Sequence, residues 1–287
     1  RGILGPDPDD LKSIVMLNRI IEWSEIGISM EADQRHVELI LRQLEMEDCR
    51  GSDIVGSQVT PDESDAKMSP EEVTQFRSLA ARCNFLAADR VDMQFACKEV
   101  CRRMSGPCAG DWEMLRKMAK YMKAHPRLVV DFKFQAAPHV VHVYVDTDYG
   151  GCRRTRRSTN GGMAILGGHL LKSWSTTQTV VALSSGEAEY YGVAKGACEG
   201  IGIAGIIEDL TGIRMKIEMA TDSSAAKGIA HRKGVGKVKH LETRTLWVQD
   251  QIARGRIGLS KIDGEINPAD LMTKYLSGPR IAQLVQL

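Results

Sequence analysis

Four carboxylates in the second half of the 287-residue chain have the residue type and setting that divalent-metal chemistry requires. They are Asp146 after VHVYV, Glu189 in SSGEAEYYG, Asp222 after IEMAT and Asp270 in NPAD. Mg²⁺ binds carboxylate, phosphate and water oxygens, and two ions about 4 Å apart can activate a water on one side of a phosphorus and stabilise the leaving oxygen on the other. We therefore predict that these four acids are catalytic and hold two Mg²⁺ ions, which Mn²⁺ can replace.

Each acid also has an ordinary structural alternative. Asp146 closes a strand, where aspartate is a common turn former, and Asp222 stands where an N-cap would. Asp270, in the first turn of a helix begun by Asn267, would complement the helix dipole. The prediction of a metal site rests on the whole set of four acids in one domain. Asp148 is assigned to the turn after the strand.

The segment SSGEAEYYG offers two glutamates, and helix geometry separates them. Ser184 and Glu187 have the spacing of a capping box, which gives Glu187 a structural task. Glu189 points to nearly the opposite side of the helix, at the head of a stripe of small residues that includes Gly192 and Gly196. A glutamate opening a buried stripe is costly unless it is paired or binds a metal, so Glu189 is the predicted ligand.

From Val140 onward, the pattern alternates between strands and helices. Strands are expected at 140–146, 161–167, 170–175, 216–221 and 257–262. Helices are expected at 186–210, directly after Asp222, at 239–254 and from Asn267. This order predicts an α/β fold with a mixed five-stranded sheet.

The first half has a different character. Residues 11–23 and 26–31 predict a β-hairpin, followed by a helix from Asp33, its cap, to about 46. Residues 47–68 are polar, without a period, and indicate a linker. Ser69, Pro70 and Glu72 mark a helix start, and further helices are expected at 91–104 and 111–124.

Composition narrows the setting of the protein. The net charge of +1 gives no overall basic field, so nucleic-acid contacts must come from local clusters. Seven cysteines, odd in number and without a CxxC pair, favour thiols in the cytosol or nucleus. No stretch is apolar for long enough to span a bilayer and no leader is recognisable, so no membrane partner is expected. A start at Arg1 rather than Met suggests a cut from something longer, by processing or by an incomplete gene model.

Several motifs in one order carry a family resemblance: YVDTDYGGCRRTRRSTNGG, SWSTTQTVVALSSGEAEYYG, ATDSSAA, KHLETRTLWVQD and NPADLMTK. Over about residues 139–277 the chain resembles the ribonuclease H domain at the end of the Pol polyprotein of copia-type LTR retrotransposons. The family's catalytic acids fall on Asp146, Glu189, Asp222 and Asp270. The resemblance thus implies a ribonuclease H-like sheet and a magnesium-dependent hydrolase.

The upstream half resembles other parts of the same polyprotein. Residues 1–46 look like the end of the reverse-transcriptase palm, 47–68 like a linker and 69–138 like thumb or connection helices, before the ribonuclease H domain at 139–287. The polymerase motif Tyr-x-Asp-Asp is absent, so polymerisation is not expected of this fragment, whose partner would be the upstream palm and fingers. The implied location is the cytoplasm, in a retrotransposon particle, with the nucleus as the alternative.

The implied substrate is an RNA/DNA hybrid, whose A-form-like duplex is read through backbone shape and 2′-hydroxyls. The predicted contacts are basic residues in two loops and one histidine: Arg153, Arg154, Arg156, Arg157, Lys233, Lys237, Lys239 and His240. The lysine run could equally be a mobile surface loop, and His240 a capping or core residue. Cellular ribonucleases H have a histidine before the last catalytic helix, and the corresponding KIDGEIN has none.

Two other functions compete with hydrolysis of the RNA strand. The first is a non-catalytic nucleic-acid-binding remnant of a decayed retroelement, which would hold the hybrid without cutting it. The second is an integrase-like strand transferase, which is disfavoured because its ligand glutamate follows the second Asp rather than preceding it.

Overall fold

The computed structural model describes residues 2–57 and 66–285, and their contacts divide the chain into two compact units. Unit 1 comprises Arg1–Phe134 and Tyr275–Gln286, and unit 2 comprises Gln135–Lys274. The predicted domain bounds 139–287 stay a prediction; division by contacts assigns Tyr275–Gln286 to unit 1. The expected linker, 47–68, lies partly outside the described residues because it includes 58–65.

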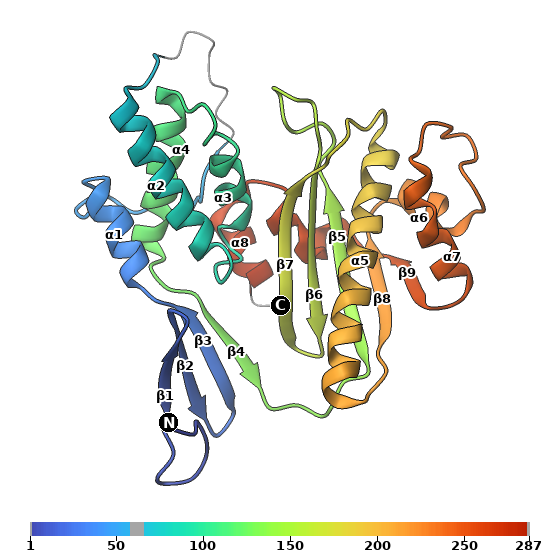
Figure 1. Cartoon of the computed structure of the whole chain (residues 1–287), viewed down its shortest axis with the longest axis horizontal. Coiled ribbons are helices and arrows are strands. Elements are labelled where there is room, and N and C mark those ends of the chain that lie inside the picture. Colours follow the sequence, from blue (N-terminus) through green and yellow to red (C-terminus); the bar gives the residue numbers. More distant parts are fainter. Residues whose placement is uncertain (1, 58–65, 286–287) are drawn as a thin grey trace. The chain divides into compact units, whose positions relative to one another are not determined.

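Unit 2 is built on a mixed five-stranded sheet (Figure 1). Its strands are β5 (Val140–Thr147), β6 (Thr159–Leu166), β7 (His169–Thr177), β8 (Lys216–Thr221) and β9 (Ile257–Lys261). The order is β7-β6-β5-β8-β9, in which β5, β6 and β7 are antiparallel neighbours and β5, β8 and β9 run parallel. This arrangement confirms the predicted α/β fold class with a mixed five-stranded sheet.

Helix α5 (Ser185–Thr211) packs closely on this sheet along its stripe of small residues. A Cβ placed on Gly196 would lie 2.5 Å from Val145 Cγ1, and one on Gly200 would lie 3.0 Å from Ile217 Cγ2. The stripe therefore sets the distance between helix and sheet, as its pattern predicted. A Cβ on Gly192 would approach the hydroxyl of Thr147, the last residue of β5, so the first turns of α5 lie beside the end of that strand.

The later connections are shorter than the sequence predicted. Helix α6 (Ser224–His231) follows β8, but the single helix expected at 239–254 is a 3-10 turn (Thr243–Thr245) and α7 (Trp247–Ala253). The helix expected from Asn267 is a 3-10 helix, η3 (Pro268–Met272). It ends where Thr273 turns its hydroxyl to Asp146, so a tertiary contact replaces a further helical turn.

Unit 1 contains a four-stranded antiparallel sheet, β1 (Ser13–Met16), β2 (Arg19–Ser24), β3 (Gly27–Ala32) and β4 (Val129–Lys133). The expected strand over 11–23 was wrong, because Leu17 and Asn18 have φ of 53° and 59° and make a tight turn within it. The helix expected to be capped by Asp33 is α1 (Arg35–Gln43), preceded by Gln34. The Asp33 carboxylate instead accepts the Arg35 amide in the turn before it.

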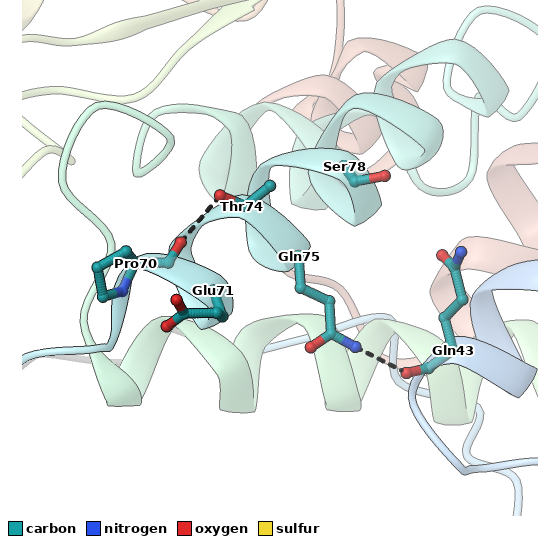
Figure 2. Close-up of a pocket in the computed structure, with 6 residues that line it drawn as sticks. All are labelled: Gln43, Pro70, Glu71, Thr74, Gln75 and Ser78. Atoms are coloured by element: carbon teal, nitrogen blue, oxygen red, sulfur yellow. Dashed lines mark hydrogen bonds between the residues drawn. The ribbon is translucent and has the colours of Figure 1, made fainter.

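The helices of unit 1 are α2 (Pro70–Leu86), α3 (Gln94–Cys101), α4 (Ala109–Ala124) and α8 (Gly278–Val285). Ser69 and Glu72 form the predicted reciprocal capping box at the start of α2. An open hollow of about 500 Å³ lies beside α2, where Gln75 donates to the carbonyl of Gln43 (Figure 2). None of the predicted site residues lines it. Within the described ranges, no helix combines the length and apolar character needed to cross a bilayer.

Candidate active site

Two of the four acids meet because two parallel strands end side by side. In the parallel pairing of β5 and β8, Val145 is the register partner of Thr221, and each is followed by an aspartate. Asp146 and Asp222 therefore lie at the carboxyl ends of neighbouring strands, which is where α/β sheets place their functional side chains.

The third acid comes from helix α5. Glu189 lies near the start of this helix, and ligand atoms of Asp146, Glu189 and Asp222 all lie within 4.8 Å of one another. Glu189 Oε2 is buried and has no hydrogen-bond partner among the described residues. A buried carboxylate oxygen without a partner is costly, and a cation bound by the three acids would supply one.

The pKa values of Glu189 and Asp146 agree with a cation site. Burial, followed by the negative charges of Asp146 and Asp222, raises the pKa of Glu189 to about 9. Burial also raises the pKa of Asp146, and Lys274 offsets only part of that effect. Since both acids resist ionisation in the protein alone, a divalent cation would be needed to hold all three in their charged form.

The structural alternatives for these acids are taken up by other residues. The N-cap of α6 is Ser223, whose hydroxyl accepts the amide of Ala226, so Asp222 does not cap that helix. Asp148 accepts the amide of Thr159 and thus serves the turn after β5.

Glu187 serves the start of α5, but the predicted capping box is formed only in part, because its carboxylate does not accept the amide of Ser184. Ser184 caps α5 by accepting the Glu187 amide at 3.2 Å, while the Glu187 carboxylate accepts the amide of Leu183 at 2.8 Å. Tyr191 and His240 also bind this carboxylate, at 2.9 and 2.7 Å. These partners hold Glu187 on its own side of α5, away from the acidic group.

Asp270 is not a member of the group of three, but one lysine connects it to that group. Lys274 Nζ lies 2.5 Å from Asp270 Oδ1 and 3.3 Å from Asp146 Oδ2. Burial opposes the charge of Lys274, but Asp146 and Asp270 outweigh it and raise the pKa of the ammonium. Thr273 donates its hydroxyl to the same oxygen of Asp146.

Two sequence features bring this last segment to the sheet. Gly161 is the register partner of Asp146, and a Cβ on it would lie 2.5 Å from Thr273 Cγ2. The glycine therefore leaves room for the segment beside Asp146. Asn267, fully buried, donates to the carbonyl of Val145 at 3.1 Å and accepts the Ala269 amide, which attaches η3 to β5.

The predicted basic residues are spread over two loops and are all exposed. The arginines occupy the β5–β6 connection, and the lysines follow α6. The side chain of His240 is 42% exposed, and its Nε2 is bound to the buried Glu187. His240 thus fastens the lysine loop to α5 and does not join the acidic group.

Sequence reasoning missed Lys274 and Thr273, although both stand in the motif NPADLMTK. The signal available was spacing: Lys274 follows Asp270 by four residues, a separation that places oppositely charged side chains together on a helix. The contact of both residues with Asp146, 127 and 128 positions away in the chain, has no counterpart in local sequence.

Comparison with solved structures returns ribonucleases H at low similarity. LC11-RNase H1, isolated from compost by a metagenomic approach, is 19% identical and is matched over 93% of its chain and 47% of this one, with a TM-score of 0.34. RNase H1 of Halobacterium salinarum is 17% identical, over 93% of its chain and 46% of this one, also with a TM-score of 0.34. A search of protein-family models gives no match.

Comparison with curated proteins returns one relative of similar length and several much longer polyproteins. The uncharacterised mitochondrial protein AtMg00810 of Arabidopsis thaliana is 31% identical over 58% of this chain and 68% of its own length. The retrovirus-related Pol polyproteins from transposon RE2 of A. thaliana and transposon TNT 1-94 of Nicotiana tabacum are 26% and 21% identical over 71% and 85% of this chain. This chain spans 14% and 19% of those two polyproteins. The chain belongs to the family of retrovirus-related Pol polyproteins of copia-type transposons.

Proposed function

We propose that this chain hydrolyses the RNA strand of RNA/DNA hybrids with divalent cations held by its acidic group. The observation that carries the proposal is the approach of Asp146, Glu189 and Asp222 to within 4.8 Å of one another. Such an approach of three acids, one of them with a buried oxygen lacking a partner, fits a Mg²⁺ site, and membership of the Pol family supports the substrate class.

The residues of the chain would divide the work as follows. Asp146, Glu189 and Asp222 would hold the cation, and Asp270 would complete the site from η3. Bound Mg²⁺ supplies charge stabilisation for a phosphoryl oxygen and activation of water. Asp146 is oriented for this by the hydroxyl of Thr273, and the ends of β5 and β8 keep the two aspartates in place.

The substrate would be held mainly through its phosphates. The arginine loop offers Arg153, Arg154, Arg156 and Arg157, and the lysine loop offers Lys233, Lys237 and Lys239, all exposed in unit 2. Charges on exposed loops position a duplex without reading its sequence, so cleavage is expected to tolerate many sequences. Since the relatives are transposon polyproteins, we place this reaction in a cytoplasmic retrotransposon particle, beside the upstream palm and fingers.

The test uses a hybrid labelled on its RNA strand, with Mg²⁺ or with EDTA. We expect RNA fragments only with Mg²⁺, and their loss in Glu189→Gln. The matched control is Glu208→Gln, an exposed glutamate on the same helix. At the helical rise per residue it lies roughly 28 Å from Glu189. A hybrid that is bound and shifted in a gel but never cut would identify a non-catalytic binding remnant and overturn the proposal.

A further inference from the structure

Lys274 pairs with two of the four predicted acids. Its ammonium lies between Asp270 Oδ1 at 2.5 Å and Asp146 Oδ2 at 3.3 Å. Asp146 is also a member of the group of three acids, so one carboxylate would serve both the ammonium and a cation bound by that group. The site thus contains one position ready for a cation and one already occupied by a side chain.

We propose that Lys274 is the resident cation of the acidic site, which binds a first Mg²⁺ through Asp146, Glu189 and Asp222 and a second only by displacing this lysine from Asp146 and Asp270. The inference rests on the proposed function. It predicts that the site binds its first ion more tightly than its second.

The geometry supports an ordered filling of the site. The group of three acids does not include Asp270. An ion bound by this group therefore leaves the pairing of Lys274 with Asp270 in place. An ion on Asp270 and Asp146 would instead meet the ammonium, because the Asp270 Oδ1 atom and the Asp146 Oδ2 atom are the lysine's own partners. Two positive charges at one position repel each other strongly.

Displacement is physically open to this side chain. The Lys274 side chain is 44% exposed, whereas those of Asp146 and Asp270 are 3% and 11% exposed. A lysine has a flexible stem and a compact ammonium that water solvates well, so it can swing outward while the carboxylates stay in place. The two acids are held by β5 and η3, which leaves Lys274 as the movable member.

The first experiment measures Mg²⁺ binding to the EDTA-stripped full chain by titration calorimetry. The wild-type protein should bind one ion tightly and a second weakly. Lys274→Met should tighten the second ion by at least about tenfold and leave the first within about threefold, since one competing charge has been removed. Lys274→Arg, which keeps the charge, should retain the weak second site.

The matched control is Lys216→Met, which removes the same charge at the opposite end of β8, roughly 20 Å from Asp222 by the rise of a strand. It should bind both ions as the wild-type protein does. A second ion of unchanged affinity in Lys274→Met would overturn the role of the lysine and leave the proposed nuclease intact. A wild-type chain that binds no Mg²⁺ would overturn the proposed function itself.

A second experiment needs no substitution. Lysine acetylation by acetic anhydride, followed by mass spectrometry, should modify Lys274 slowly without metal, because both acids hold its ammonium. At Mg²⁺ concentrations that fill the second site, its acetylation should rise severalfold while that of Lys216 stays constant. Equal acetylation of Lys274 with and without Mg²⁺ would show that the lysine keeps its partners and would overturn the inference.

Discussion

Glu187 and Glu189 stand two residues apart on α5, and about 200° of helical rotation gives them different environments. Glu187 turns to the amide of Leu183 and to the side chains of Tyr191 and His240, which satisfy its charge. Glu189 turns to Asp146 and Asp222, whose negative charges add to the effect of burial in raising its pKa. The first glutamate stabilises the helix start, and the second resists ionisation until a cation stabilises its charged form.

Asp222→Asn tests the metal site at the residue least involved in structure. Since Ser223 caps α6, the amide should leave the fold intact while removing one negative ligand. Cleavage of the hybrid should fall on the order of 10³-fold, or about 4 kcal/mol of transition-state stabilisation. Cleavage rates, with circular dichroism as the folding check, measure this. Full activity in a folded variant would refute the assignment of Asp222.

Glu189 should make the metal-free protein less stable as the pH rises. Its folded pKa of about 9 lies above the usual 4.5, so its stabilising contribution is complete below pH 4.5 and is lost as the pH rises towards 9. Glu189→Gln does not titrate, so its advantage over wild type in the free energy of unfolding should grow between pH 5 and pH 8. The slope cannot exceed about 1.4 kcal/mol per pH unit for one proton.

Urea unfolding in EDTA at both pH values measures this difference, with Glu208→Gln as the exposed control. The control should track the wild-type protein at both pH values. A Glu189→Gln variant whose advantage is the same at pH 5 and pH 8 would contradict the raised pKa.

The positions of the acids could be read from the sequence because strand ends and helix faces follow from local periodicity. The opposite orientations of Glu187 and Glu189 also follow from two residues of helix. Lys274 could not be found in this way, because its meeting with Asp146 depends on how η3 returns to β5. That return is fixed by the bond from the buried Asn267 to the carbonyl of Val145, 122 positions away, and by the space at Gly161. Local sequence reveals neither contact.

At the scale of elements, the path of the segment after η3 should depend on Gly161. A Cβ in Gly161→Ala would come within 2.5 Å of Thr273 and 2.6 Å of Met272, so the segment must move. We expect a loss of about 1–3 kcal/mol in the free energy of unfolding. The second metal site should also weaken, because Asp270 moves with the segment and away from Asp146.

Gly202→Ala is the matched control, since a Cβ there meets nothing within 4 Å and the residue is exposed on α5. It should leave stability unchanged or raise it by up to about 1 kcal/mol. Chemical denaturation of both variants, together with Mg²⁺ titration, makes the comparison. Equal stability of the two variants would show that the segment does not need the space at Gly161.

The loop between β5 and β6 should contribute affinity for the hybrid through charge alone. Replacing Arg153, Arg154, Arg156 and Arg157 by Gln should weaken binding and lower the slope of log K against log[salt] by about one for each phosphate that the loop no longer neutralises. Fluorescence anisotropy with hybrids of several sequences at 50–300 mM salt, roughly the range over which salt weakens binding to phosphates, measures both. A variant with an unchanged slope would show that this loop does not bind the phosphates.

The sheet of unit 2 was predictable almost strand by strand because apolar runs and turn residues alternate clearly. Two kinds of element were not. The strand expected over 11–23 is interrupted by Leu17 and Asn18, whose positive φ values no apolar pattern reveals. The helix expected at 239–254 begins as α7 only at Trp247, and His240, in the irregular segment before it, binds Glu187, 53 residues distant in the chain.

At the scale of the whole molecule, the acidic site and its supporting residues all belong to one of the two units. Asp146, Glu189, Asp222, Asp270 and Lys274 lie within Gln135–Lys274, and the contacts of Arg1–Phe134 form a separate cluster. A ligand that binds only the folded site stabilises the part of the protein whose unfolding would release it. Stabilisation by Mg²⁺ should therefore be largest in unit 2.

Mg²⁺ should protect the amides of α5 and β5 from hydrogen exchange far more than those of α2 and α4. At a free Mg²⁺ concentration of 100 times the dissociation constant, the free energy of opening the site should rise by about 2.7 kcal/mol. Amides of unit 1 that exchange by their own local opening should show no such rise. Exchange measured by mass spectrometry in Mg²⁺ and in EDTA gives both values for one sample. In Asp222→Asn the gain in α5 and β5 should shrink, because one ligand of the ion is removed. Equal protection of α2 and α5 in the wild-type protein would show that the ion is bound elsewhere or that the two units open together.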